Sequence, residues 1–209
     1  WFSFRRVLPL EREARALREE LDDLRLFTAE ALDLDAAVRR PGHALEEVAS
    51  RVLGALHRRQ QELTFAAFSK RADGSAVLLA HRGGPWARLE LSAFRFDQGL
   101  LSRAAASGRS SWHLNEGAPG ETDALVRALA QQGYSEATAA GWTDERGAGV
   151  VLAVRSGPEG DGAALASRLE LSATALRSAS TLALGLVALS TSQEKLQGGL
   201  SAAMEELTA

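Results

Sequence analysis

The chain has 209 residues, 45% of them hydrophobic and 24% charged, which is normal for a soluble globular protein and allows one sizeable domain with helical extensions. The formal net charge of −3 gives no sign of a nucleic acid or an acidic membrane surface as partner. There are no cysteines, which excludes disulfides, thiolate metal sites, cysteine nucleophiles and thioether-linked cofactors.

Composition and the first residues bear on source and location. Only two of the 24 basic residues are lysines, Lys70 and Lys195, and this bias toward arginine favours a bacterial source. The lack of cysteine is compatible with a cytoplasmic location. No run reaches the roughly 18 apolar residues that span a bilayer. Residues 1–6 nevertheless look like the interfacial end of a membrane helix. A cytoplasmic domain tethered to the inner membrane by a segment before Trp1 is therefore one reading, and an ordinary helix start is the other.

A helix with a coiled-coil stripe is the first predicted element. Its apolar side chains recur in alternating steps of four and three residues, with Glu and Arg between them. Such a helix is marginal alone and needs a partner, for which we expect a second copy, with the chain's own C-terminal helix as the alternative. The stripe consists of Leu10, Ala14, Leu17, Leu21, Leu24, Thr28 and Ala31.

A helix and a hairpin follow the Pro41-Gly42 break. Residues 45–56 carry apolar side chains along one side, which predicts a helix that covers a sheet. Residues 64–71 and 76–82 flank an Asp-Gly turn, a strong hairpin signal.

The next segment predicts a strand, a short helix and a second strand. Residues 88–96 alternate apolar and polar side chains with one step out of phase, which indicates a strand with a bulge or bend. Asp97 is the expected N-cap of a short helix that ends at Gly108, in the left-handed position. Residues 110–114 are predicted to form the second strand.

The last predicted elements of the central domain are a helix and a hairpin. After a Gly- and Pro-rich loop, Thr122 is expected to cap a helix that ends at Gly133. Residues 134–143 and 148–155 then form a hairpin. The second of these strands is nearly all apolar, as a central strand should be.

A long C-terminal helix ends the chain. A second stripe with steps of four and three predicts another dimer seam, and Gly198-Gly199 within it should loosen or kink the helix. The stripe consists of Leu182, Leu186, Leu189, Gln193, Leu196, Leu200, Ala203 and Leu207.

These elements define three parts. We predict an N-terminal coiled-coil helix at residues 1–40, a domain at residues 41–160, and a C-terminal helix that extends into a coiled coil at residues 161–209. The fold class is α+β, with a mostly antiparallel sheet, helices on one face, and terminal helices that bracket the domain.

Two stretches carry a resemblance to a known family. Residues 96–114 run from Phe96-Asp97-Gln98-Gly99-Leu100-Leu101 through Gly108-Arg109 to Trp112-His113-Leu114, and residues 135–154 end in Gly149-Val150-Val151-Leu152-Ala153-Val154. Both are similar to recurring segments of the PAS-related GAF sensor domains, and the resemblance covers roughly residues 43–185. It implies a GAF-like fold and a role in bacterial signal transduction.

The sequence departs from several GAF subfamilies. Without cysteine, the chain can neither attach a bilin covalently nor act as a GAF-fold methionine sulfoxide reductase. The Asn-Lys…Phe…Asp-Glu set of cyclic-nucleotide-binding members is not found. Ala139-Ala140-Gly141-Trp142 stands where the family's last hairpin usually has a Pro-apolar step. The resemblance therefore implies a pocket without naming its ligand.

Aromatic side chains supply a candidate ligand pocket. They cluster in the segments that line the cavity of GAF folds, and aromatic walls with a few polar groups suit small molecules. The alternative is that they simply fill the core. Haem bound through histidine is disfavoured, and the cofactor is otherwise unknown. The predicted pocket residues are Trp86, Phe94, Trp112, His113, Tyr134 and Trp142.

Catalytic chemistry finds no support. Ser111 and His113 would point the same way on a strand, but no third orienting group accompanies them. The four histidines form no metal-spaced pair, and the arginines lack an aromatic stacking platform, so we expect no enzyme activity, metal or nucleic-acid partner.

Two functions fit these patterns. The first is a sensor or relay domain that forms a homodimer through its terminal helices and passes a ligand- or partner-induced change to an output domain. The alternative is a degenerate, ligand-free GAF scaffold for protein–protein interaction, which a filled cavity would favour.

Overall fold

The computed structural model describes residues 44–114, 123–144, 147–157 and 162–208. The predicted N-terminal helix, with Leu10, Leu17, Leu21 and Leu24, lies outside them, as does Thr122. The described part contains one five-stranded antiparallel sheet in the order β2-β1-β5-β4-β3. The strands are β1 (Thr64–Lys70), β2 (Ala76–Arg82), β3 (Arg109–His113), β4 (Glu136–Asp144) and β5 (Gly147–Arg155).

Strand β5 lies at the centre of the sheet, as its apolar sequence predicts. Successive side chains of a strand point to opposite faces. Val150, Leu152 and Val154 thus belong to one core, and Val151 and Ala153 belong to the other. All five are buried, so both faces of the sheet must be covered.

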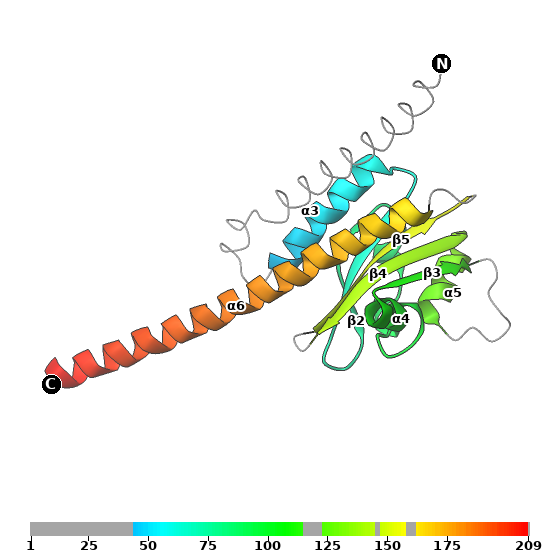
Figure 1. The fold of residues 1–209 in the computed structure, drawn as a ribbon. Helices are drawn as coiled ribbons and strands as arrows, with labels where there is room; N and C mark the ends of the chain where they lie inside the picture. The colour runs from blue at the N-terminus through cyan, green and yellow to red at the C-terminus, as the bar shows by residue number, and fades with distance from the viewer. Residues whose placement is uncertain (1–43, 115–122, 145–146, 158–161, 209) are drawn as a thin grey trace, which may run out of the picture.

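Helices cover both faces (Figure 1). On one face lie α3 (Ala44–Arg59) and the start of α6 (Gly162–Thr208), and on the other lie α4 (Gly99–Ser107) and α5 (Ala124–Gln131). The predicted α+β class with an antiparallel sheet is confirmed. The prediction placed helices on one face only. The structure has helices on both faces, because the central strands are apolar on both sides.

The predicted strand at residues 88–96 is wrong. This segment forms two short 3-10 helices, η2 (Trp86–Arg88) and η3 (Leu91–Ala93), and its one bridge of the strand type joins Arg95 to Ser75 in the described residues. The hydrogen bonds inside its 3-10 turns are local, such as Phe94 N–H to Leu91 O at 3.1 Å, and Phe94 O accepts one from Ala76 N–H of β2 at 2.9 Å. The apolar positions three apart suit one turn of such a helix, and the segment lies over the sheet.

Helix α6 continues through Gly198-Gly199 to Thr208, so any loosening or kink at these glycines does not end the helix. A glycine in a helix costs about 1 kcal/mol relative to alanine, which a long helix can tolerate. In the described part of the chain, no helix is both long and apolar enough to cross a membrane.

The cap of α4 also differs from the prediction. Asp97 forms an ion pair with Arg95 at 2.9 Å and does not cap the helix. Instead, the buried Asp123 carboxylate accepts hydrogen bonds from the backbone N–H of Leu100 at 2.5 Å and of Leu125 at 2.9 Å. One carboxylate therefore serves the N-termini of both α4 and α5, where the helix dipoles favour negative charge. Gly108 ends α4 with a left-handed φ of 76°, as predicted.

The tip of the β1–β2 hairpin carries two carboxylates that its neighbours stabilise in the charged form. The hydrogen bond from the Ser75 side chain is the main cause of the lowered pKa of Asp73. The hydrogen bond from Arg95 is the main cause of the lowered pKa of Asp97. Both carboxylates are ionised at neutral pH. They help to hold the tip against residues 94–96, where Phe96 N–H donates to Gly74 O at 2.9 Å.

Replacing Asp123 by alanine should destabilise the domain by about 1–3 kcal/mol, because buried N–H groups at two helix N-termini lose their acceptor. Urea unfolding measures this loss. The matched control is Asp97→Ala, which removes the carboxylate that the sequence favours as cap and should cost clearly less. An equal loss in both variants would contradict the shared cap.

Candidate functional site

Four of the six predicted pocket residues lie together on the α4 and α5 face of the sheet. Trp86 in η2 is 0% exposed and Phe94 is 2% exposed, and both lie within the core. Trp112 on β3 and Tyr134 before β4 are half-buried at the margin of the same core. The sequence therefore identified a real aromatic cluster.

The other two residues lie on the opposite face, which corrects the predicted pocket. His113 follows Trp112 directly on β3 and therefore points the other way, where it is exposed. Trp142 belongs to the core under α3 and α6 and packs over Gly149 of β5. The His113 side chain therefore does not face the aromatic core on the α4 side.

Aromatic rings fill the centre of the α4-side core. Phe68 of β1, which the sequence analysis did not select, contacts Trp86 edge-to-face at a centroid distance of 5.9 Å and Phe94 at 6.4 Å. Such pairs are attractive beyond the area they bury. The periodicity of β1 could have identified Phe68, since it shares a face with Ala66.

A turn of two glycines closes one end of this core. Gly83 and Gly84 have φ values of 69° and 67°, which favour glycine. A Cβ on Gly84 would overlap Thr64 and would lie 2.9 Å from Tyr134 Oη and 3.2 Å from Trp86 Nε1. The turn thus covers a small polar cluster, in which Trp86 Nε1 has no hydrogen-bond partner among the described residues.

The described histidines do not form a metal site. His57 Nδ1 lies 3.1 Å from Leu63 O, His81 is on β2, and His113 is on the far edge strand. Across residues 44–114, 123–144, 147–157 and 162–208, no three His, Asp or Glu side chains gather as metal ligands would.

Helix α6 leaves the domain after its first turns (Figure 1). Leu165, Leu169 and Leu176 are buried against the sheet and α3. Farther along, Gln193 is exposed, and Leu196 is 74% exposed. Of the predicted dimer residues on this helix, only Leu196 has a described side chain. Leu182, Leu186, Leu189, Leu200 and Leu207 are placed by the helix backbone alone.

An ion pair lies where α6 begins. Glu136 and Arg155 face each other across β4 and β5, with their charged atoms 3.7 Å apart. Their side chains are only 15% and 13% exposed. Leu63 and Leu165 border the same spot, so this pair belongs to the surface on which α6 rests.

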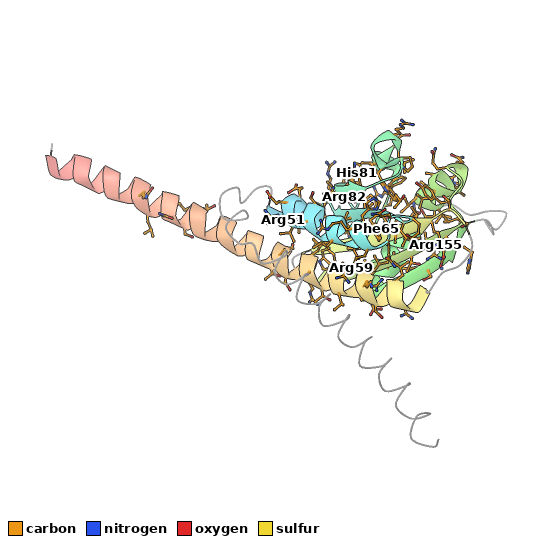
Figure 2. The ribbon with its side chains drawn as sticks, turned by 90° about the horizontal axis from the view of Figure 1, so that it is seen from above. Arg51, Arg59, Phe65, His81, Arg82 and Arg155 are labelled. Carbon is orange, nitrogen blue, oxygen red and sulfur yellow. The ribbon has the colours of Figure 1, made fainter. Side chains whose placement is uncertain are left out.

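An open groove of about 520 Å³ runs between α3 and the edge strand β2. Residues 46–51 of α3 and 79–82 of β2 line it. Arg82 is one of the lining residues, and it donates from Nη2 to the Ser50 hydroxyl at 2.7 Å and from Nη1 to His81 O at 2.8 Å. Figure 2 shows Arg51 on α3 on the same side of the domain as His81 and Arg82. None of the predicted pocket residues lines this groove.

Solved structures with similar architecture decide the fold. The GAF domain of an Acinetobacter phosphoenolpyruvate-protein phosphotransferase superposes with a TM-score of 0.54 at 14% identity, covering 80% of this chain and 95% of that one. The phycoerythrobilin-bound GAF domain of a cyanobacterial phytochrome gives 0.53 at 15% identity, covering 79% and 97%. The GAF domain/HD domain protein from Geobacter sulfurreducens gives 0.53 at 16%, covering 68% and 97%.

The chain has the GAF fold. No protein-family model matches the sequence, and neither does any curated protein. Within the GAF fold, the two stretches that carried the resemblance are α4 with β3 and β4 with β5. Both stretches consist of helices and strands of the domain itself. They therefore indicated the fold and did not identify a ligand.

Truncating Trp86 to alanine should cost about 3–5 kcal/mol of unfolding free energy, since a fully buried ring is removed from the core. Trp86→Phe should cost less, because it keeps ring contacts and removes a buried donor that lacks a described partner. Trp112→Ala, at the margin of the core, should also cost less than Trp86→Ala. Chemical unfolding ranks the three variants, and a Trp112→Ala loss as large as that of Trp86→Ala would contradict the filled core.

Proposed function

We propose that this chain is a signal-relay domain of a bacterial cytoplasmic regulatory protein and has no enzyme activity of its own. It forms a homodimer through its terminal helices and passes a change at the GAF fold to an output domain. The observation that carries the proposal is the continuity of α6, which begins in the core and ends well outside the domain.

A continuous helix transmits position because it is stiff over several turns. The first turns of α6 rest on β4, β5 and α3 through the buried Leu165, Leu169 and Leu176. A shift of this docked part, by ligand or partner, displaces the outer part with it. Two alternative packings of the helix are enough for signalling, provided that the input binds them unequally.

The outer part of α6 needs a partner. An isolated helix in water is marginal, and Leu196 is a large apolar side chain that is 74% exposed. It belongs to the predicted stripe with steps of four and three, the pattern by which two helices pair. Gln193 occupies a stripe position, and a polar residue there sets the register of a pair at some cost in stability. These features support a second copy as the partner.

The ligand-free scaffold remains the second candidate, and the packed aromatic core favours it. Phe68, Trp86 and Phe94 occupy the centre of the core with edge-to-face contacts. Native mass spectrometry separates the two candidates. A dimer that carries a small mass lost on denaturation supports a ligand-regulated sensor, and a dimer without added mass supports a scaffold or a domain driven by a partner protein.

The dimer seam predicts a contrast between two substitutions on α6. Leu196→Glu places a charge in the seam and should convert the dimer to monomer. Thr191→Glu places the same charge on the opposite side of the helix and should leave the dimer intact. Light scattering of both variants measures the molar mass. A dimer that survives Leu196→Glu would contradict pairing through this seam.

The relay itself predicts coupling between the docked and outer parts of α6. The chain has no cysteine, so Lys195→Cys provides a single attachment site for a spin label. In a dimer, the two labels report the distance between the outer parts of the two α6 helices. Leu176→Ala weakens docking and should shift or broaden that distance. The milder Leu176→Val serves if the alanine variant unfolds.

Thr174→Ala, on the exposed side of the same turn, is the matched control and should leave the distance unchanged. An unchanged distance in folded Leu176 variants would contradict the proposed relay but not the proposed dimer.

A further inference from the structure

A charged pair interrupts the apolar surface on which α6 begins. Glu136 is the first residue of β4, Arg155 is the last of β5, and the two face each other in the sheet. Ala153, two residues before Arg155, belongs to the core under α3 and α6, so the pair shares that face. Leu63 and Leu165 border the pair, and Leu165 belongs to the first turns of α6. The charges therefore lie beside the start of that helix (Figure 2).

The pair is almost removed from water. The side chains of Glu136 and Arg155 are 15% and 13% exposed. A buried ion pair recovers the hydration it has lost only where its geometry is close to ideal. Here the two charged atoms, Arg155 Nη1 and Glu136 Oε2, are 3.7 Å apart, whereas a charge-assisted hydrogen bond measures roughly 2.7–2.9 Å. Their mutual attraction therefore offsets only part of the cost of covering them.

The rest of the docked helix is held by apolar contacts. Leu169, Ala173 and Leu176 are buried in the core that α6 shares with α3 and the sheet. Burial of apolar side chains favours docking in proportion to the area that is covered. Docking therefore gains least at the start of α6, where the covered surface includes the charged pair.

We propose that the Glu136–Arg155 pair keeps the start of α6 easy to release from the sheet. Release of the first turns uncovers the pair, and water then hydrates both charges. This hydration offsets part of the apolar contact that Leu165 loses. An apolar pair at the same two positions lacks the compensation and holds the start of the helix more firmly. The charged pair thus brings the docked and released packings of α6 closer in free energy.

The meaning of this release for signalling rests on the proposed relay, which needs two packings of α6 that an input can interconvert. When the two packings are close in free energy, an input that binds them only a little differently can shift their populations. The effect of the pair on docking does not depend on the dimer, because all the residues concerned belong to one chain.

Hydrogen exchange of the full chain, followed by mass spectrometry, tests the inference. Glu136→Leu combined with Arg155→Met replaces the pair by apolar side chains of similar length. The matched control makes the same changes, Glu47→Leu with Arg51→Met, at a more exposed ion pair on α3. The measured quantity is the exchange rate of the amides of residues 165–176. The amides of β1 are the internal reference, since their exchange reports the stability of the sheet.

We expect exchange at residues 165–176 to slow several-fold in the double variant and to stay unchanged in the control. Arg155→Met alone should speed it, because the Glu136 carboxylate then stays nearly buried without this partner. Unchanged or faster exchange in the double variant would overturn the inference. An equal slowing in β1 would overturn it too, because it indicates a general gain in stability.

A second variant covers the case in which the apolar pair does not fold. Glu136→Gln with Arg155→Gln removes both charges and keeps polar side chains, and it should slow the same exchange, with the same results counting against the inference. The spin-label distance from Lys195→Cys separates this inference from the relay. Slowed exchange with an unchanged distance would support the role of the pair in docking and contradict the relay.

Discussion

The apolar character of β5 on both sides is the constraint from which the rest of the architecture follows. A strand that is buried on one face only can leave the other face in water, but Val150 to Val154 are buried without exception. Water must therefore be excluded from both faces at the centre of the sheet. One cover comes from α3 and α6, and the other from α4, α5 and the aromatic segment between β2 and α4. The buried side chains of the two covers form separate clusters.

The two faces of the sheet differ in what they carry. The α4 side holds the aromatic core, where Phe68, Trp86 and Phe94 fill the interior and Gly84 closes one end without a side chain. The α3 and α6 side holds the helix that leaves the domain and the groove beside the edge strand. Strand β5 contributes side chains to both cores, as its neighbours β1 and β4 also do, so the pleat of these strands connects the interior of one side to the surface under α6 on the other. The nearly buried Glu136–Arg155 pair at the end of β5 lies under the start of α6.

Much of the fold was predictable because its signals are local. The Asp-Gly turn fixed the β1–β2 hairpin, the continuous apolar run identified the central strand, and the period of residues 45–56 gave α3. Some of the errors arise because the deciding partner lies far away in the sequence. Asp97 has the residue type and position of a helix cap, yet the cap is Asp123, which lies 23 residues after Leu100, whose N–H it accepts. In the candidate pocket, the alternation of side chains along a strand places the adjacent residues Trp112 and His113 on opposite faces. Applying this rule to the sequence would have removed His113 from the predicted pocket. Nothing local could have placed Trp142 in the opposite core, since that depends on how β4 aligns with β5.

The uninterrupted course of α6 has a consequence for how this domain can be joined to others. Each residue of an α-helix turns the chain by about 100° and advances it by about 1.5 Å. The direction in which a domain attached to this helix would face, measured around the helix axis, therefore depends on the number of residues after Leu176. Loss or gain of one residue in the outer helix rotates everything beyond it by more than a quarter turn, whereas a change of seven nearly restores the original angle. Under the proposed relay, lengths of this helix that keep the coupling are therefore spaced in steps of seven, and natural fusions to different outputs should fall on that series.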